Sequence, residues 1–532
     1  MKKHSKNDWL SFFPFQTPRP EQELAINFIL DKFSEGKKFV CADLATGIGK
    51  SAIAVTVARY LHQSCYILTT QKILQEQYNN DFGDSGRKLL KSLKSSSNYT
   101  CTFTCNSSCG DTRRIIRSLE DEMKDKEIYK HCMKQSVYMD AKRAFLDENI
   151  GITNFAYYLA ETQYAAALTP RPLLIIDEAH QLESELSRNV EISFSEKFAK
   201  ETLKLKIWPT SKKQSEIVNW IETKYKAAVQ KKIKLLEREL RDSYLSSEDS
   251  SIFEKLVKQN TMLDKHICKI NRFLKTYVED NWVVNIDVSE KNKQKIQFKP
   301  VDISSHAHEA LFDTTSKVLL MSATLINKDA FCRSIGLKSN EVAYIHIPCP
   351  FPKENRKVHV LPIGKMSYNH IDKTLPILAN AVTEIISQHA EEKGIIHCTS
   401  FKIAKFLMEN VKSTRLITHN SENREQVLAQ HKMTAMPSVI VSPSMAEGVD
   451  LADDASRFQI ICKMPFPPLN DELVKKRMAR DKNWYAYQTL KTIIQSLGRS
   501  IRNEKDYAAT YILDEDWNNF YSRNKSMFSE DF

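Results

Sequence analysis

The most informative segment of the chain reads Asp43-Leu44-Ala45-Thr46-Gly47-Ile48-Gly49-Lys50-Ser51, and it follows a short apolar run that ends near Cys41. In a phosphate-binding loop, small residues let backbone N–H groups approach a phosphate, a lysine reaches the β- and γ-phosphates, and a hydroxyl binds Mg²⁺. This segment provides all three features, so it predicts a site for ATP and Mg²⁺. Strict spacing would place a glycine at position 44, where leucine stands, and the alternative is a glycine-rich turn without a ligand. The residues expected to contact the nucleotide are Thr46, Gly47, Gly49, Lys50 and Ser51.

Short apolar runs alternate with helical stretches along the rest of the chain, which is typical of parallel α/β sheets. The first set of expected strands covers 38–41, 64–68, 173–176 and 318–321. The second set covers 358–361, 394–397, 438–441, 459–462 and 510–513. Two such sets predict an α/β protein with two similar lobes.

An acidic motif, Asp177-Glu178-Ala179-His180, follows the expected strand 173–176 directly. A carboxylate at the carboxyl end of that strand can reach the Mg²⁺ held by Ser51, and the next carboxylate can deprotonate a water. We therefore expect Asp177 to bind Mg²⁺ and Glu178 to act as the general base. The alternative is a surface Asp-Glu pair that begins a helix.

A third motif lies far along the chain and reads Gln495-Ser496-Leu497-Gly498-Arg499-Ser500-Ile501-Arg502. Arginines three residues apart share one face of a helix. From the second lobe, Arg499 and Arg502 could reach the γ-phosphate and stabilise the charge of the transition state, with Gln495 beside them. Taken alone, the two arginines could equally be exposed residues of a basic helix.

These three motifs, in this order, resemble those of superfamily 2 helicases, and further segments resemble the iron–sulfur XPD/DinG-like group. Gln22 stands in that group's adenine-reading position, and Met445-Ala446 replaces the aromatic residue that the group usually has before Glu447. The resemblance covers nearly the whole chain and implies two RecA-like lobes. The segments that resemble the group's motifs are 13–15 and 19–22 at the adenine side, 69–77 for motif Ia, 322–325 for motif III, 442–450 for motif V, and Pro465-Phe466-Pro467-Pro468 after it.

Four cysteines lie within 32 residues of one another: Cys101, Cys105, Cys109 and Cys132. In a reducing compartment such a cluster indicates a metal site rather than disulfides. Four thiolates suit either a [4Fe–4S] cluster or tetrahedral Zn²⁺, and spacing alone does not choose between them. The resemblance implies the [4Fe–4S] cluster, because the XPD/DinG-like group carries one at this place in the chain.

Residues 191–300 are expected to be mainly helical, with one apolar stripe on a long helix between Ile252 and Tyr277. They hold 23 Lys+Arg and 16 Asp+Glu, so they supply seven of the chain's eleven excess positive charges. The resemblance implies an arch-like insertion here, although a solvated helical surface would have the same composition. The expected domains are a first lobe built from 1–98, 136–190 and 301–340, a cluster domain at 99–135, the arch-like domain at 191–300, and a second lobe at 341–532.

The resemblance implies an ATP-dependent DNA helicase that moves 5′→3′ on single-stranded DNA and unwinds duplex, forked or R-loop substrates. The alternatives are a translocase that remodels protein–nucleic acid complexes, an RNA helicase with a structural zinc site, and an ATP-gated scaffold. We expect a monomer that binds single-stranded and forked DNA, with no defined protein partner. No apolar run has the roughly 20 residues of a membrane span, which predicts a cytoplasmic protein, nucleoid-associated in a bacterium or nuclear in a eukaryote.

Overall fold

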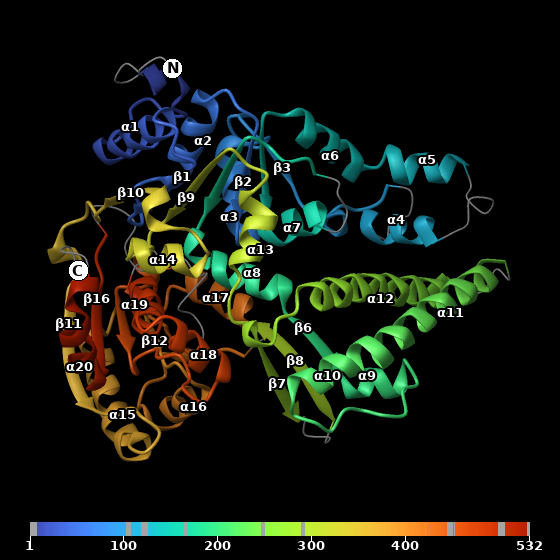
Figure 1. Cartoon of the computed structure of the whole chain (residues 1–532). Coiled ribbons are helices and arrows are strands. Elements are labelled where there is room, and N and C mark those ends of the chain that lie inside the picture. Colours follow the sequence, from blue (N-terminus) through green and yellow to red (C-terminus); the bar gives the residue numbers. More distant parts are fainter. Residues whose placement is uncertain are drawn as a thin grey trace.

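The computed structural model describes residues 8–102, 108–118, 126–163, 168–245, 250–288, 293–420, 422–443, 451, 453–497 and 506–528. Two parallel sheets form separate lobes, and a third sheet is antiparallel (Figure 1). This arrangement confirms the predicted α/β fold with two lobes. Among the helices of these described ranges, none combines the length and the apolar character that crossing a membrane requires.

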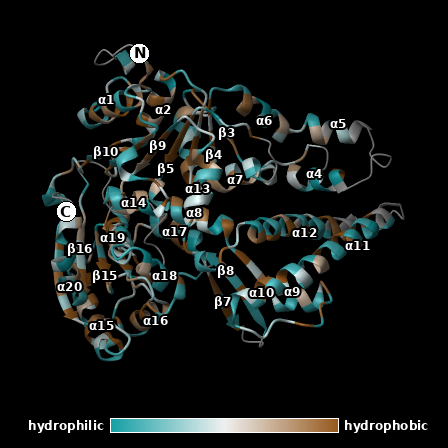
Figure 2. Ribbon diagram, viewed as in Figure 1, coloured by the Kyte–Doolittle hydropathy of each residue, from teal (hydrophilic) through white to brown (hydrophobic). Residues whose placement is uncertain are grey.

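The first lobe is a seven-stranded parallel sheet whose strands alternate between two hydrophobic cores. Phe39 and Cys41 of strand β1 (Phe39–Leu44) pack in one core, and Val40 and Ala42 of the same strand pack in the other. Burial on both faces explains the continuous apolar runs of the sequence. The strands β5 (Leu173–Asp177) and β9 (Lys317–Ser322) are accordingly coloured as hydrophobic in Figure 2. The spatial order is β10 (Val342–Ile347), β1 (Phe39–Leu44), β9 (Lys317–Ser322), β5 (Leu173–Asp177), β2 (Cys65–Thr69), β4 (Ile150–Asn154) and β3 (Lys91–Leu93).

The sequence predicted β1, β2, β5 and β9 but missed β3, β4 and β10, because polar residues interrupt their apolar pattern. Helices connect the strands of this lobe and cover the sheet (Figure 1). They are α1 (Pro20–Ser34), α2 (Lys50–Tyr60), α3 (Lys72–Phe82), α7 (Phe155–Gln163), α8 (Leu182–Val190), α13 (Ser304–Ala307) and α14 (Lys328–Ser334).

The second lobe is a six-stranded parallel sheet in the order β11 (Val358–Gly364), β16 (Ala509–Asp514), β15 (Phe458–Ile461), β12 (Gly394–His397), β14 (Val439–Ser442) and β13 (Leu416–Thr418). All five predicted strands are present, and the three-residue β13 was missed. The surrounding helices are α15 (Ile371–Gln388), α16 (Phe401–Asn410), α17 (Arg424–Met433), α18 (Glu472–Arg480), α19 (Trp484–Leu497) and α20 (Asp516–Asn524).

The segment 191–300 contains more strand than its sequence predicted. Its long helices, α11 (Lys226–Leu245) and α12 (Ser250–Thr276), pack against each other, as the apolar stripe had indicated. They share one core with an antiparallel sheet, in which Trp282 and Phe298 are buried. The sheet was missed because its strands alternate with polar residues in the Lys-rich sequence. It consists of β6 (Ile192–Ser195), β8 (Gln294–Pro300) and β7 (Trp282–Val288), beside the shorter helices α9 (Glu196–Glu201) and α10 (Gln214–Trp220).

The segment with the clustered cysteines folds mainly as helices, namely α4 (Cys109–Ser118), α5 (Lys126–Lys134) and α6 (Val137–Asp147). The helical arm of this segment and the α11–α12 arm project on the same side of the molecule (Figure 1). The two arms contact each other through α4 and α12. Two segments that are far apart in the sequence thus meet beyond the first lobe.

Candidate nucleotide and nucleic-acid site

The phosphate loop joins the end of β1 to the first turn of α2, whose free backbone N–H groups and dipole favour an anion. Gly47 and Gly49 adopt φ values of +86° and +89°, a region that suits glycine. At Gly49 a side chain is excluded for a second reason, because a Cβ there would lie 2.5 Å from Gln22 Nε2. The loop conformation is therefore encoded by its own glycines.

Helix α1 braces this loop through two polar side chains. Gln22 Nε2 donates to the carbonyl oxygen of Ile48 at 2.9 Å, and its Oε1 accepts from the backbone N–H of Arg19 at 2.9 Å. Arg19 Nη1 in turn donates to the Gly47 carbonyl at 2.7 Å. Gln22 thus lies against the loop, and the adenine contact expected from it stays a prediction.

Asp177 lies at the carboxyl end of β5 with 4% of its surface exposed. Its Oδ2 accepts from the Tyr78 hydroxyl at 2.9 Å, and its Oδ1 accepts from the Glu178 backbone N–H at 2.9 Å. Burial and the neighbouring Glu178 carboxylate raise the pKa of Asp177 to about 6, although Lys50 and Tyr78 act in the opposite direction. A bound cation would favour the ionised form of such a carboxyl group, which fits the predicted Mg²⁺ ligand.

A chain of polar side chains leads from the acidic motif across to the second lobe. Glu178 has a left-handed backbone (φ +55°), and its Oε2 lies 3.2 Å from His180 Nδ1. The same imidazole nitrogen lies 2.7 Å from Ser322 Oγ, which accepts from the backbone N–H of Thr324 at 3.1 Å. Gln495 Nε2 of α19 then donates to Thr324 Oγ1 at 3.4 Å. Changes at Gln495 can therefore reach the orientation of Glu178 through direct contacts.

One cavity of about 1060 Å³ between the lobes brings most of the predicted nucleotide residues together. Gln22 supports the loop from behind and does not line this cavity. Arg499 and Arg502 lie outside the described residues, immediately after the end of α19 at Leu497. The residues predicted for the nucleotide and its hydrolysis that line the cavity are Thr46, Gly47, Gly49, Lys50, Ser51, Asp177, Glu178 and Gln495.

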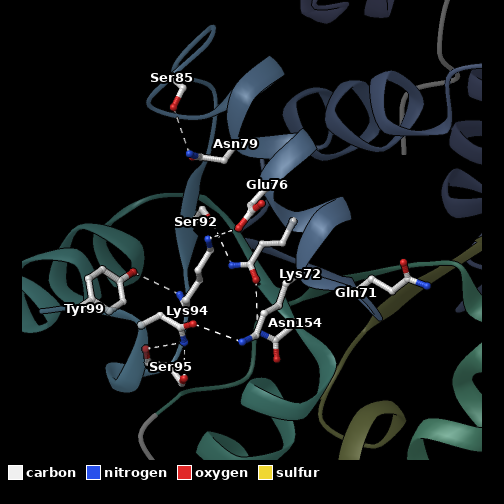
Figure 3. Close-up of polar contacts among 12 residues, drawn as sticks. Gln71, Lys72, Glu76, Asn79, Ser85, Ser92, Lys94, Ser95, Tyr99 and Asn154 are labelled. Carbon is white, nitrogen blue, oxygen red and sulfur yellow. Dashed lines mark hydrogen bonds and ion pairs between the residues drawn. The ribbon is translucent and has the colours of Figure 1, made fainter. Parts of the chain in front are cut away.

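Figure 3 shows the start of α3, which lies within the segment 69–77 that resembles motif Ia. Behind it, buried Gln75 donates to Ser92 Oγ at 3.0 Å and to the Leu93 carbonyl at 2.9 Å, and accepts from Asn154 at 3.3 Å. Gln71 points away from this network. These hydrogen bonds of Gln75 fix α3 to β3 and β4, and Gln71 takes no part in them.

Three of the four clustered cysteines are described, and all three are buried: Cys101, Cys109 and Cys132. Burial and the proximity of Cys101 and Cys109 raise the pKa of the Cys132 thiol to about 11. A bound metal cation would lower the pKa of these neighbouring thiols and favour their thiolate forms. The cysteines are therefore suitable donors for a thiolate-ligated metal. Cys105 lies outside the described residues, and within those ranges no three His, Cys, Asp or Glu side chains are placed as a metal site.

Sequence reasoning missed several polar residues around the cavity. Asp43 is buried and accepts from the backbone N–H groups of Leu325 and Ile326 at 3.1 and 3.3 Å, and from the Tyr344 hydroxyl at 3.0 Å. Tyr78 was missed as a partner of Asp177. Asp43 directly precedes the phosphate loop, but the local sequence around it does not indicate partners some 280 residues away.

Two family models match parts of the chain. The helicase C-terminal domain matches residues 383–531, and the res subunit of type III restriction enzymes matches residues 15–206. The second match covers the phosphate loop and the acidic motif, and the first covers the arginine motif. Both halves of the candidate site thus lie in matched segments.

Among curated proteins, a probable ATP-dependent helicase of Methanocaldococcus jannaschii is 25% identical over 48% of this chain and 42% of its own length. The ATP-dependent DNA helicase DinG of Photobacterium profundum is 26% identical over 41% of this chain and 34% of its own. The chain therefore spans less than half the length of these two relatives. The ATP-dependent DNA helicase YoaA of Haemophilus influenzae is 22% identical over 93% of this chain and 91% of its own length.

Solved structures share the fold at low sequence identity. A structure described as an XPD helicase gives a TM-score of 0.65 at 16% identity, covering 96% of this chain and 98% of its own. S. tokodaii Xpd4 gives 0.58 at 14% identity, covering 96% and 98%. The two parallel lobes are therefore RecA-like. With the order of the motifs, these matches support a superfamily 2 helicase of the XPD/DinG-like kind.

Proposed function

We propose that this protein is an ATP-dependent DNA helicase that translocates 5′→3′ on single-stranded DNA and unwinds duplex, forked or R-loop substrates. The observation that carries the proposal is the single cavity lined by the phosphate loop, the acidic motif and Gln495. The relatives named as ATP-dependent DNA helicases support it. The protein would act as a monomer, at the nucleoid of a bacterium or in the nucleus of a eukaryote.

ATP would bind with its phosphates on the first turn of α2, beside Lys50. Ser51 and Asp177 would hold Mg²⁺, which neutralises charge between the β- and γ-phosphates when bound. Glu178 would orient and deprotonate the attacking water, while His180 limits the freedom of its carboxylate. Arg499 and Arg502 would stabilise the transition state from the second lobe, so hydrolysis would require the lobes to close.

Single-stranded DNA would cross both lobes, contacting Thr70 and Gln71 in the first and Thr399 and Ser400 in the second. Ser400 Oγ caps α16 by accepting from the Ile403 backbone N–H at 3.3 Å, and Thr399 has φ +56°. The N-terminal turn of such a helix suits a phosphate through its dipole and the backbone N–H groups that the cap does not use. Contacts of this kind carry little sequence information, so the preference for particular bases should be weak.

Cys101, Cys105, Cys109 and Cys132 would hold a [4Fe–4S] cluster within residues 99–135, next to the arch-like domain at 191–300. The cluster would make this segment rigid enough to separate strands. Anaerobically purified protein should be brown, with roughly four irons per chain. Cys105→Ser should bleach it and uncouple unwinding from ATP hydrolysis. Colourless protein with one zinc per chain would contradict the cluster and favour the RNA helicase alternative.

The nucleotide site is tested by Lys50→Ala, which should abolish DNA-stimulated ATP hydrolysis while single-stranded DNA still binds. Lys338→Ala, at an exposed lysine in the same lobe, serves as the matched control and should keep wild-type turnover. Retained hydrolysis in Lys50→Ala would refute the assignment. Hydrolysis without strand displacement on forked DNA in the wild-type chain would favour the remodelling translocase.

A further inference from the structure

One helix of the second lobe, α18, contacts two other parts of the molecule. These are α8, which follows the acidic motif, and the base of the 191–300 insertion. Helix α18 lies between the second lobe and the antiparallel sheet in Figure 1. Three of its cationic residues, Lys476, Arg477 and Arg480, each bond to the other side of this junction. A cluster of this kind on a nine-residue helix concentrates the polar contacts between the lobes.

Arg477 is the centre of the junction. Its Nη1 pairs with Glu183 Oε1 at 2.9 Å, and the two side chains are 12% and 10% exposed. Its Nη2 donates to Ser187 Oγ and to the Pro300 carbonyl, both at 3.2 Å, and its Nε donates to the Val301 carbonyl at 3.2 Å. One guanidinium thus binds α8 and the end of β8 together, which a planar fork of donors can do and a lysine cannot.

Glu183 extends the acidic motif, three residues after His180 on the first turn of α8. Its second carboxylate oxygen accepts from Gln488 Nε2 of α19 at 3.0 Å. Lys491 of the same helix donates to the His180 carbonyl at 3.5 Å. Because α19 also carries Gln495, His180 at the end of the acidic motif and Glu183 beyond it both contact the helix that precedes the arginine motif.

The base of the insertion is held on the other side of α18. Lys476 Nζ donates to the Trp282 carbonyl at 3.0 Å. Arg480 donates to Asn281 Oδ1 at 3.1 Å and pairs with Asp302 Oδ2 at 3.2 Å. The insertion interrupts the first lobe in sequence, yet its base is bonded to a helix of the second.

We propose that Glu183 and Arg477 are positioning residues that transmit lobe closure to the acidic motif, and that α18 makes the insertion move with the second lobe. This inference rests on the proposed ATP-driven movement along DNA. If the Glu183–Arg477 ion pair were broken, the residues of the nucleotide site would stay in place, but the site would no longer be coupled to the second lobe. Buried, hydrogen-bonded ion pairs suit this role because breaking one leaves an uncompensated charge.

The first test is Glu183→Gln, which keeps the side chain's size and an acceptor for Gln488 but removes the ion pair. We expect the DNA-stimulated kcat to fall roughly tenfold, the size of a typical coupling between sites, while the KM for ATP stays within about twofold. Arg477→Lys should give an intermediate loss. Arg333→Ala removes an exposed ion pair with Asp481 that also crosses the lobes, and this matched control should keep full stimulation.

The second test joins the insertion to α18 by a covalent crosslink. Val278 and Ala479 are exposed and line the same cavity of about 400 Å³ at this junction. A cleavable thiol crosslinker between Val278→Cys and Ala479→Cys should leave DNA-stimulated hydrolysis intact, because the two elements move together. The parent chain treated with the same reagent is the control.

Two results would overturn the inference. One is full DNA stimulation in Glu183→Gln, and the other is hydrolysis that stops on crosslinking and returns when the linker is cleaved. A failure of the proposed function would look different, because the wild-type chain itself would then show no Lys50-dependent hydrolysis.

Discussion

The two lobes carry almost the same local sequence at one strand end, with different outcomes. Strand β5 ends in Ile175-Ile176-Asp177-Glu178, and β16 ends in Ile512-Leu513-Asp514-Glu515. Both aspartates are buried, with exposures of 4% and 1%. Burial raises the pKa of each carboxyl group.

The two aspartates, Asp177 and Asp514, differ in their hydrogen-bond partners. Asp514 accepts from the backbone N–H groups of Met464, Asp516 and Met366 at 2.9, 3.1 and 3.4 Å, so it fastens loops. Asp177 accepts from one backbone group and one hydroxyl and lines the cavity beside the phosphate loop.

The following glutamates diverge in the same way. Glu178 has a left-handed backbone and contacts His180, whereas Glu515 is exposed with φ −59° at the start of α20. The comparison teaches that an apolar strand followed by Asp-Glu specifies a buried carboxylate, and that its neighbours decide whether the carboxylate has a chemical role.

The largest expected effect is at the glutamates. Glu178→Gln should lower the DNA-stimulated kcat roughly 10²- to 10⁴-fold, because general base catalysis contributes about that much. Glu515→Gln is its matched counterpart and should leave kcat unchanged. Steady-state hydrolysis of ATP measures both, and comparable losses would show that the two strand ends are not functionally distinct.

A smaller effect is expected at the hydroxyl that orients Asp177. Tyr78→Phe should raise the Mg²⁺ concentration for half-maximal hydrolysis roughly tenfold, since groups that orient a metal ligand contribute about 10- to 100-fold to affinity. Tyr511→Phe also removes a buried hydroxyl, which lies 2.9 Å from His389 Nε2 in the second lobe. Titrations with Mg²⁺ should separate the two variants, and equal half-saturation points would argue against Asp177 as the ligand.

The smallest effect on activity is expected for Asp514→Asn, which should keep hydrolysis but lower the free energy of unfolding by about 1–3 kcal/mol through weakened loop contacts. A carboxyl with a raised folded pKa stabilises most below its unfolded value and loses that contribution as pH rises through the folded pKa. The deficit of Asp514→Asn should therefore be larger at pH 4 than at pH 7. Denaturant melts at both values measure it, and a deficit that grows with pH would contradict this role.

Much of the candidate nucleotide site could be predicted because its groups are adjacent in sequence. The phosphate loop and the acidic motif each place their chemistry within a few residues of a strand end, and parallel strands bring those ends to one edge of a sheet. Tyr78, Asp43 and Glu183 could not be predicted, because each acts through a partner from a distant segment. The antiparallel sheet of the insertion was missed for a related reason, since its alternating strands acquire a core only when α11 and α12 cover them.

Local sequence was enough to predict the two α/β lobes, to locate the candidate nucleotide motifs and to reveal the family resemblance, because apolar periodicity and local spacing act over short distances. The tertiary structure decided which of two Asp-Glu pairs lines the cavity, how Gln495 reaches Glu178, and that the insertion's base is bonded to α18. Those outcomes depend on contacts between residues more than a hundred positions apart. Such contacts exist only after the sheets have folded and the lobes have met.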